Sequence, residues 1–255
     1  MNQENVLAKF SLKDKVVILT GGEGFLGKEY QKALREAGAT VVVFDKNGQV
    51  PVNITDEASV KKAVYGVVAQ YGHVDVLINN AAMNPKVGDE DSKKMFAPVE
   101  EYPLKLWREE LEVNLTGMLI CIQAVVPHMK KQGRGNIVNI ASEVSNIAHD
   151  HRVYHEAGKY KSPAYVASKT GIVGLTRALA AQLGQYNIRV NAFSLGGVEH
   201  EKMPKDFVKR FGETTMLGRM AKVGEYNGAI VFLSSDASSF MTGSNLTIDG
   251  GKHAW

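Results

Sequence analysis

Residues 16–27 read VVILTGGEGFLG, a short apolar run followed by a turn that contains four glycines. An uninterrupted run of aliphatic residues predicts a strand that is buried on both faces. Helical periodicity follows from about residue 24 to residue 37, and Gly38 is a typical C-terminal stop. Strand, glycine-rich turn and helix in this order predict a pyrophosphate-binding site. The glycines let a phosphate approach the backbone, and the helix N-terminus offers it unpaired N–H groups.

An acidic residue beyond the turn makes this prediction more specific. Asp45 ends the next apolar run, 45 − 27 = 18 residues after Gly27. A carboxylate there accepts hydrogen bonds from the adenosine ribose hydroxyls and repels a 2′-phosphate, so we expect NAD as the cofactor. Lys46 beside it weakens this discrimination, so NADP stays the less favoured alternative. In the turn itself, the residues expected to line the cofactor are Gly21, Glu23, Gly24, Phe25 and Leu26.

Apolar runs and helical stretches alternate along the rest of the chain. This alternation predicts the α/β class: a single-domain, doubly wound parallel sheet (Rossmann-type) with helices on both faces. No repeat, linker or change of composition divides the chain, so we expect residues 1–255 to form one domain. The expected strands are residues 41–44, 74–78, 136–140, 188–193 and 246–248, and the further expected helices are residues 58–71, 104–129 and 163–184.

One connection departs from the alternation. The residues Val50, Pro51 and Val52 resemble a third strand, yet only four residues separate them from Asp45. A parallel crossover normally needs a dozen or more residues and a helix. We therefore expect a bare loop in place of that helix; the alternative is that residues 50–52 are not a strand.

Composition excludes several classes of protein. Of the 255 residues, 44% are hydrophobic, the formal net charge is +3, and no long basic block supports nucleic-acid binding. Cys121 is the single cysteine, so neither an internal disulfide nor a cysteine metal cluster can form. The N-terminal residues lack the apolar core of a signal peptide, and no apolar run approaches the roughly 18 residues of a membrane span. We expect a soluble cytoplasmic protein.

Two residues in the stretch 163–184 suggest acid–base chemistry. Tyr165 and Lys169 are four residues apart, and Ser162 and Pro163 are suited to the first positions of a helix. Residues at this spacing share a helix face, so the ammonium is expected to favour the phenolate. At an effective dielectric of about 20, this attraction lowers the pKa of a tyrosine from about 10 toward about 7. Such a tyrosine is a general acid and base at neutral pH.

Further segments occur in one order: NNAA at 79–82, Asn114, Ser142, YVASK at 165–169, IRVN at 188–191 and DGG at 249–251. With these segments the chain resembles the classical short-chain dehydrogenase/reductase family from about residue 13 to residue 251. The resemblance implies that Tyr165 exchanges a proton with the substrate oxygen while Ser142 hydrogen-bonds that oxygen. It implies that Lys169 binds the nicotinamide ribose and lowers the pKa of Tyr165. It also implies that Asn114 holds a water molecule of a proton relay.

The same resemblance assigns further cofactor contacts. Asn80 and Ala81 are expected to line the cleft, and Asn53 with Ile54 is expected near the adenine, where an amide oxygen can still accept from the adenine amino group. Gly197 and Val198 belong to a loop expected at the nicotinamide carboxamide. Family members often form tetramers through two long helices, so we expect a homo-oligomer, a tetramer or a dimer.

The glycine spacing leaves alternatives open. Gly21, Gly24 and Gly27 resemble the family's extended branch of nucleotide-sugar epimerases and dehydratases, and Phe25 stands where classical members have a glycine. The chain length and the other segments favour the classical branch. A redox-neutral epimerase or dehydratase and a non-catalytic dinucleotide sensor therefore remain the alternatives to a dehydrogenase. Leu195 replaces a usual proline, which leaves the position of the following loop open.

Two inserts, at about residues 83–103 and 143–162, are expected at the mouth of the active site. The second insert is polar, and Arg152, Tyr154 and His155 are its expected substrate-binding residues, with Arg152 suited to a carboxylate or phosphate. It predicts a hydroxyl-rich or acidic substrate, and both inserts are loosely similar to oxidoreductases associated with flagellin glycosylation and acidic-sugar metabolism. The alternative is a solvated loop or a subunit contact. We expect no metal, because tyrosine-assisted hydride transfer needs none.

Overall fold

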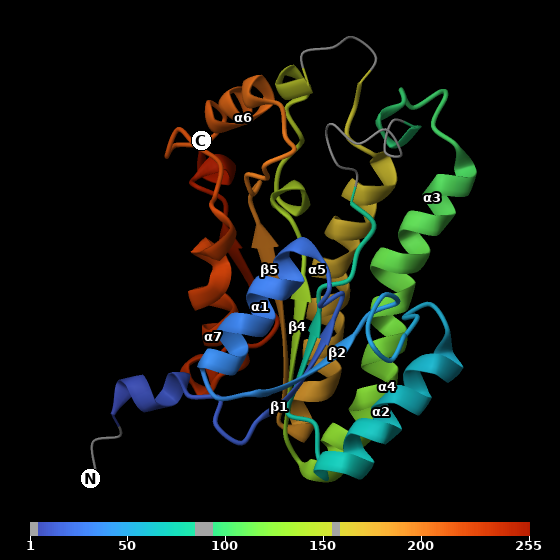
Figure 1. Ribbon diagram of the computed structural model, residues 1–255, viewed down its shortest axis with the longest axis vertical. Helices are drawn as coiled ribbons and strands as arrows, with labels where there is room; N and C mark the ends of the chain where they lie inside the picture. The colour runs from blue at the N-terminus through green and yellow to red at the C-terminus, as the bar shows by residue number, and fades with distance from the viewer. Residues whose placement is uncertain (1–4, 85–93, 155–158) are drawn as a thin grey trace.

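The computed structural model describes residues 5–84, 94–154 and 159–255. Six parallel strands form one sheet in the order β2-β1-β3-β4-β5-β6. The parallel, doubly wound α/β sheet predicted from the sequence is therefore confirmed (Figure 1). The strands are β1 (Val16–Thr20), β2 (Thr40–Phe44), β3 (Val76–Asn79), β4 (Gly135–Ile140), β5 (Ile188–Leu195) and β6 (Asn245–Ile248).

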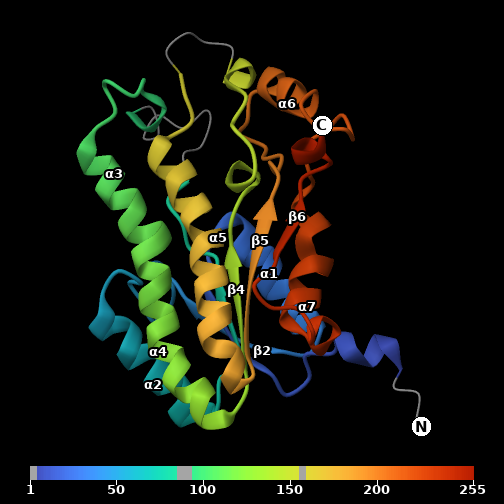
Figure 2. The ribbon, with the colours of Figure 1, turned by 180° about the vertical axis from the view of Figure 1, so that it is seen from behind.

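Helices cover both faces of the sheet, as Figures 1 and 2 show from opposite sides. Side chains alternate along β1, so Val16 and Ile18 join one apolar core while Val17 and Leu19 join the other. The first core includes α2 (Glu57–Tyr71), α4 (Gly117–Gln132) and α5 (Pro163–Leu183), and the second includes α1 (Phe25–Glu36) and α7 (Asn227–Ser234). The remaining α-helices are α3 (Leu104–Leu111) and α6 (Lys205–Gly212).

The crossover after β2 corrects one expectation. Residues 50–52 form no strand, so the expected bare-loop crossover to a third strand there is wrong and the alternative reading is correct. The chain runs from β2 through an irregular segment to α2 and then to β3. The Val52 N–H donates to the Asp45 carbonyl at 3.0 Å, which turns the segment back on itself, and Pro51 has no N–H to offer a sheet.

The long helix expected over residues 104–129 is interrupted. A π-helical turn, Glu112–Thr116, lies between α3 and α4. By length and composition alone, the stretch Leu104–Gln132 could cross a membrane. However, α4 supplies Met118, Ile122 and Val125 to the apolar core beneath the sheet, so we interpret the stretch as a core element of the fold.

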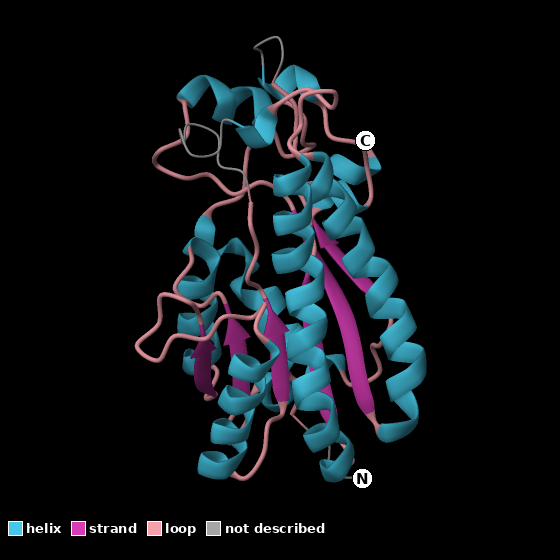
Figure 3. Ribbon diagram, turned by 90° about the vertical axis from the view of Figure 1, so that its right-hand side faces the viewer, coloured by secondary structure: helices cyan, strands magenta, loops and turns pink. Residues whose placement is uncertain are grey.

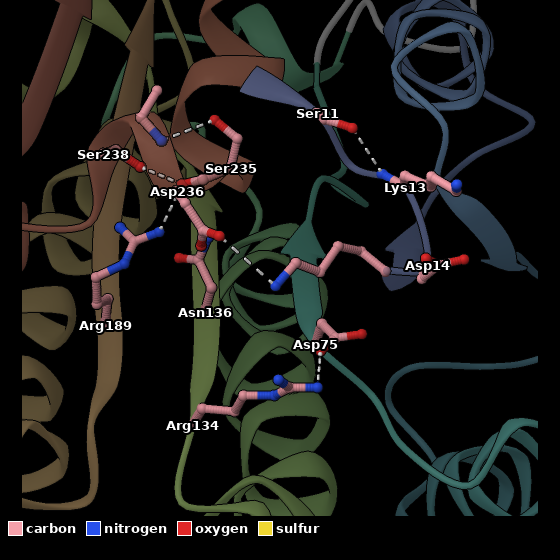
Figure 4. Close-up of polar contacts among 12 residues, drawn as sticks. Ser11, Lys13, Asp14, Asp75, Arg134, Asn136, Arg189, Ser235, Asp236 and Ser238 are labelled. Carbon is pink, nitrogen blue, oxygen red and sulfur yellow. Dashed lines mark hydrogen bonds and ion pairs between the residues drawn. The ribbon is translucent and has the colours of Figure 1, made fainter. Parts of the chain in front are cut away.

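The amino ends of the strands are held by a structural polar network (Figure 4). The Asp75 carboxylate accepts the Val16 N–H at 2.9 Å and lies 3.3 Å from an Arg134 nitrogen, while Arg189 donates to the Ser235 carbonyl at 3.2 Å. At the opposite end of the sheet, loops and short helices gather above the strand arrowheads (Figure 3), and α6 lies at that end (Figure 1). In open parallel sheets, ligands bind at the carboxyl ends of the strands.

Candidate active site

The glycine turn lies between β1 and α1 and is closely packed. Gly21 has a φ of 65°, and a Cβ there would lie 2.7 Å from the Ala81 Cα. A Cβ on Gly27 would lie 2.2 Å from the Gly21 carbonyl oxygen. Among the residues that the structure describes, no side chain caps the α1 N-terminus at Gly24. The first N–H groups of α1 therefore have no side-chain acceptor, and this arrangement fits a dinucleotide phosphate.

Asn80 fixes this turn from the end of β3. Its side-chain nitrogen donates to the Thr20 and Gly21 carbonyls, each at 3.0 Å. The backbone N–H groups of Asn80 and Ala81 both donate to the Thr20 hydroxyl at 3.0 Å. The side chain of Asn80 thus holds the glycine turn in place.

The Asp45 carboxylate lies beside the same turn, at the carboxyl end of β2. It accepts the Glu23 N–H at 3.0 Å and the Asn47 N–H at 2.9 Å, and the residue is half-buried. These bonds orient a negative charge at the rim of the turn. The ribose contact expected from the sequence stays a prediction. Phe25 is exposed, and its ring lies edge-on to His200 with the centroids 4.8 Å apart.

The other expected cofactor residues have different surroundings. Ile54 is buried and packs against Gly117, where a Cβ would meet the Ile54 side chain first. Asn53 is exposed, and its side-chain oxygen accepts the Thr55 N–H at 3.2 Å. Val198 forms a β-bridge with Ala221, and Gly197 lies so close to the Phe211 ring that a Cβ would be 2.4 Å from it. Leu195, which replaces the usual proline, is the last residue of β5. The loop after this strand packs against α6, because Gly197 lies against the Phe211 ring.

Asn114 lies in the π-helical turn, and its amide is fully engaged by the protein. The side-chain oxygen accepts the Met83 N–H at 2.7 Å, and the nitrogen donates to the Met83 carbonyl at 3.0 Å and to the Ser168 hydroxyl at 3.1 Å. Ser168 in turn donates to the Tyr165 carbonyl at 2.8 Å. The amide therefore connects the first insert to α5, and the proposed water relay stays a prediction.

Ser142, Tyr165 and Lys169 come together at the carboxyl end of β4. All three are buried, and Ser142 lies close enough to the Tyr165 phenol to lower its pKa. The Lys169 ammonium donates to the Ile140 carbonyl at 2.7 Å and lies 5.7 Å from the centroid of the Tyr165 ring. Ser162 caps α5 by accepting the Tyr165 N–H at 3.1 Å, which confirms the helix start expected from the sequence.

The acidic phenol that the four-residue spacing predicted is not present, and that expectation is wrong for this structure. Burial raises the pKa of Tyr165 to about 12, although the hydrogen bond to Ser142 opposes this rise. Burial, together with the charge of Lys161, lowers the pKa of Lys169 to about 7. Spacing put both side chains on one helix face, but it could not give the desolvation that dominates both pKa values.

The second insert places its expected substrate residues apart. Arg152 is exposed and forms a two-bond pair with Asp150, with N–O distances of 2.8 and 2.9 Å. Tyr154 is buried in an apolar cluster with Phe96, Phe207 and Phe211. His155 lies outside the described residues. Their roles in substrate binding therefore stay predictions.

Sequence reasoning missed three charged residues near Tyr165. Glu143, directly after Ser142, forms a buried ion pair with Lys252 at 2.8 Å. Lys161 lies four residues before Tyr165, with its ammonium 4.1 Å from the centroid of the tyrosine ring. The spacing that singled out Lys169 could also have found Lys161, whereas the Glu143–Lys252 pair joins residues 109 positions apart. Within the described ranges, no group of three or more His, Cys, Asp or Glu residues could hold a metal.

Comparison with known proteins agrees with this geometry. A family model described as "Enoyl-(Acyl carrier protein) reductase" matches residues 15–253. The trans-4-hydroxycyclohexanecarboxylate dehydrogenase of Sinomonas cyclohexanicum is 35% identical, over 94% of this chain and 93% of that protein.

Two solved structures are also similar. A gluconate 5-dehydrogenase from Burkholderia cenocepacia J2315, in complex with NADP and tartrate, is 27% identical with a TM-score of 0.86, over 98% of this chain and all (100%) of that one. An NAD⁺-bound xylitol dehydrogenase is 29% identical with a TM-score of 0.82, over 94% of this chain and 99% of that one.

Proposed function

The chain belongs to the short-chain dehydrogenase/reductase family, and we propose that it is an NAD-dependent dehydrogenase acting on a polar, sugar-like or acidic-sugar substrate. The reaction interconverts a secondary alcohol and a ketone. One observation carries the proposal: Ser142, Tyr165 and Lys169 converge at the carboxyl end of β4, on the same edge of the parallel sheet as the glycine turn.

Each residue of the cluster has a separate task in the proposed reaction. The bound dinucleotide supplies the hydride acceptor or donor. Tyr165 is protonated at neutral pH, so its hydroxyl donates a proton to the ketone oxygen in reduction and becomes a phenolate. In oxidation the phenol first releases its proton to solvent, and the phenolate then accepts the proton of the alcohol. Ser142 hydrogen-bonds the same oxygen and orients the carbinol carbon. Lys169 is positioned to bind the ribose hydroxyls of the cofactor, and Asn114 fixes the helix that carries both residues.

The substrate class is supported by the relatives and by the polar second insert. One relative is a hydroxycyclohexanecarboxylate dehydrogenase, and two similar structures are a gluconate dehydrogenase and a xylitol dehydrogenase. These substrates share hydroxyl groups, and two of them carry a carboxylate. The association with flagellin glycosylation stays a prediction.

A panel assay tests this function. The enzyme is incubated with NAD or NADP and with polyols, aldonates and sugar acids, and reduced-nicotinamide absorbance is followed. We expect net formation of NADH with at least one polar alcohol. Consumption of a substrate without net NADH would instead support a redox-neutral epimerase or dehydratase, the alternative that the glycine spacing favours.

Cofactor choice is proposed to depend on Asp45. Replacing Asp45→Asn removes the negative charge that repels a 2′-phosphate, and like-charge contacts of this kind are worth about 1.4 kcal/mol or more. We therefore expect the NAD/NADP ratio of kcat/KM to fall about 10-fold or more. Glu57→Gln removes one exposed carboxylate from α2 and should leave the ratio unchanged. An unchanged ratio in Asp45→Asn would show that this carboxylate does not select the cofactor.

We also propose a cytoplasmic homo-oligomer, either a tetramer or a dimer, with no nucleic-acid or membrane partner. Two exposed aromatic residues near the C-terminus, Phe240 and Trp255, support a subunit contact. Exposed aromatic rings are enriched at interfaces relative to the rest of a protein surface.

A further inference from the structure

The ammonium of Lys161 lies over the ring of Tyr165 in the proposed active site. Its Nζ is 4.1 Å from the centroid of the Tyr165 ring, closer than the 5.7 Å of the Lys169 Nζ. The backbone at this point is fixed, because Ser162 accepts the Tyr165 N–H and also donates to the buried Glu110 carboxylate at 2.8 Å. Lys161 is therefore held beside the phenol by the start of α5.

Within the described residues, Lys161 has no carboxylate in direct contact. Its ammonium donates to the Asn84 side-chain oxygen at 3.2 Å, a neutral acceptor. Glu143 and Glu110 attract it from a distance, but each already has other partners. Glu143 is paired with Lys252 at 2.8 Å, and Glu110 accepts from Tyr102 and Ser162. Among the residues that the structure describes, this half-buried cation beside the phenol has no carboxylate in contact, which suits it to an anionic ligand.

Two neighbouring groups also respond to this positive charge. Burial, Lys161 and Lys252 together lower the pKa of His149 to about 3, so its imidazole is neutral. Lys161 also contributes to the lowered pKa of Lys169. Both shifts are the expected response to a positive potential on this side of Tyr165.

We propose that Lys161 is a specificity-determining residue that binds the carboxylate of a polyhydroxy acid whose carbinol is held by Tyr165 and Ser142. The inference rests on the proposed function and adds the residue that recognises the acid. Arg152, the residue that the sequence favoured for this task, is tied to Asp150 and has a side chain that is 91% exposed. An ammonium over the Tyr165 ring is instead within reach of a carboxylate a few bonds away from the reacting carbon.

Matched substrates and variants test the proposal. The substrates are an aldonate and the polyol of the same carbon skeleton, such as gluconate and sorbitol. Lys161→Met keeps the length and apolar stem of the side chain, and Lys161→Arg keeps its charge. Arg152→Gln removes a cation from the same insert. For each enzyme, kcat and KM are measured with both substrates, and thermal unfolding and dinucleotide affinity are recorded to detect misfolded protein.

We expect the wild type to favour the aldonate. Lys161→Met should lower kcat/KM for the aldonate about 10- to 100-fold, mainly through KM, because a charge-assisted hydrogen bond is lost. The polyol should change less than about twofold, the arginine variant should retain most of the acid preference, and Arg152→Gln should retain all of it. An equal loss with both substrates, a loss of acid preference in Arg152→Gln alone, or a wild type that favours the polyol would overturn the inference.

Failure of the inference and failure of the proposed function give different results. If the wild type oxidises polyols but Lys161→Met leaves the acid/polyol ratio of kcat/KM unchanged, the proposed dehydrogenase function is supported and the proposed role of Lys161 is wrong. If the wild type forms no reduced nicotinamide with any polyol, aldonate or sugar acid, the proposed function falls, and with it the inference that rests on it.

The pH dependence of the substrate preference also tests the proposal, because a purely structural role of Lys161 would not change it. Burial lowers the pKa of Lys161 to about 8; Glu143 and Glu110 oppose this shift, and Lys252 adds to it. The acid/polyol ratio of kcat/KM should therefore fall as the pH rises through about 8, because the ammonium loses its charge. The charge of Lys169, whose pKa is lowered to about 7, also acts on an anionic substrate but not on a neutral one. The same profile is therefore recorded with Lys161→Met, in which the fall of the ratio through about pH 8 should be absent. A ratio that stays flat across that pH range in the wild type would contradict the proposal.

Discussion

Tyr165→Phe is expected to lower kcat about 10²- to 10⁴-fold, the usual contribution of a positioned proton donor. The change removes one hydroxyl and keeps the ring that packs below Lys161, so the fold and the cofactor cleft should persist. Dinucleotide affinity should accordingly stay within about twofold of the wild type. The measurement is steady-state turnover with the best substrate, together with a titration of NAD binding.

A second tyrosine serves as the control. Tyr30 is fully buried in the core formed by α1 and α7, on the other side of the sheet from α5. Its hydroxyl has no hydrogen-bond partner within the described part of the chain, so Tyr30→Phe removes the same atom at little cost to stability. Normal turnover in Tyr165→Phe, or an equal loss in Tyr30→Phe, would contradict the role of Tyr165.

Gly27→Ala is expected to destabilise the protein and to weaken dinucleotide binding. The added Cβ would lie 2.2 Å from the Gly21 carbonyl oxygen and 2.7 Å from the Gly22 Cα, so the backbone of the turn must move. Overpacking of this kind typically costs about 1–3 kcal/mol of unfolding free energy, and backbone neighbours favour the upper end. Because the same turn forms the phosphate site, we expect NAD affinity to fall at least about 10-fold.

Gly66→Ala is the matched control for this change. Gly66 lies inside α2, and a Cβ there would meet no heavy atom within 4 Å. The substitution should stabilise the protein by up to about 1 kcal/mol, because alanine favours the helix more than glycine does. Denaturant unfolding and a dinucleotide titration measure both variants. If Gly27→Ala were as stable as the wild type and bound NAD equally well, the assigned role of the turn would be wrong.

The elements that the sequence predicted well have strong local signals. The β1 run is buried on both faces, and Gly21 and Gly27 stand where the structure leaves no room for a side chain. The expected strand at residues 50–52 was wrong, because a run of three residues that includes a proline does not distinguish a strand from a loop. The π-helical turn around Asn114 had no signal in the apolar periodicity, which continues from α3 into α4.

The chemistry of the site depended on contacts that sequence spacing cannot give. Tyr165 and Lys169 do share a face of α5, but burial shifts the pKa values of both, and the charge of Lys161 adds to the shift of Lys169. Charge alone favoured Arg152 as the anion-binding residue of the second insert. Local pairing with Asp150 occupies that arginine, while the turn before α5 carries Lys161 to the tyrosine. Which of the two cations lies beside the tyrosine therefore depends on tertiary contacts, which sequence spacing does not show.

The central claim is that Tyr165 serves a hydride transfer between a secondary alcohol and bound nicotinamide. Its most direct test uses an alcohol substrate deuterated at the carbinol carbon, incubated with NAD and the wild-type enzyme, with mass spectrometry of the recovered dinucleotide. The account predicts singly deuterated NADH in amounts equal to the ketone formed, and formation of both at least about 100-fold more slowly with Tyr165→Phe. Conversion of the alcohol with no deuterium in the dinucleotide would contradict it.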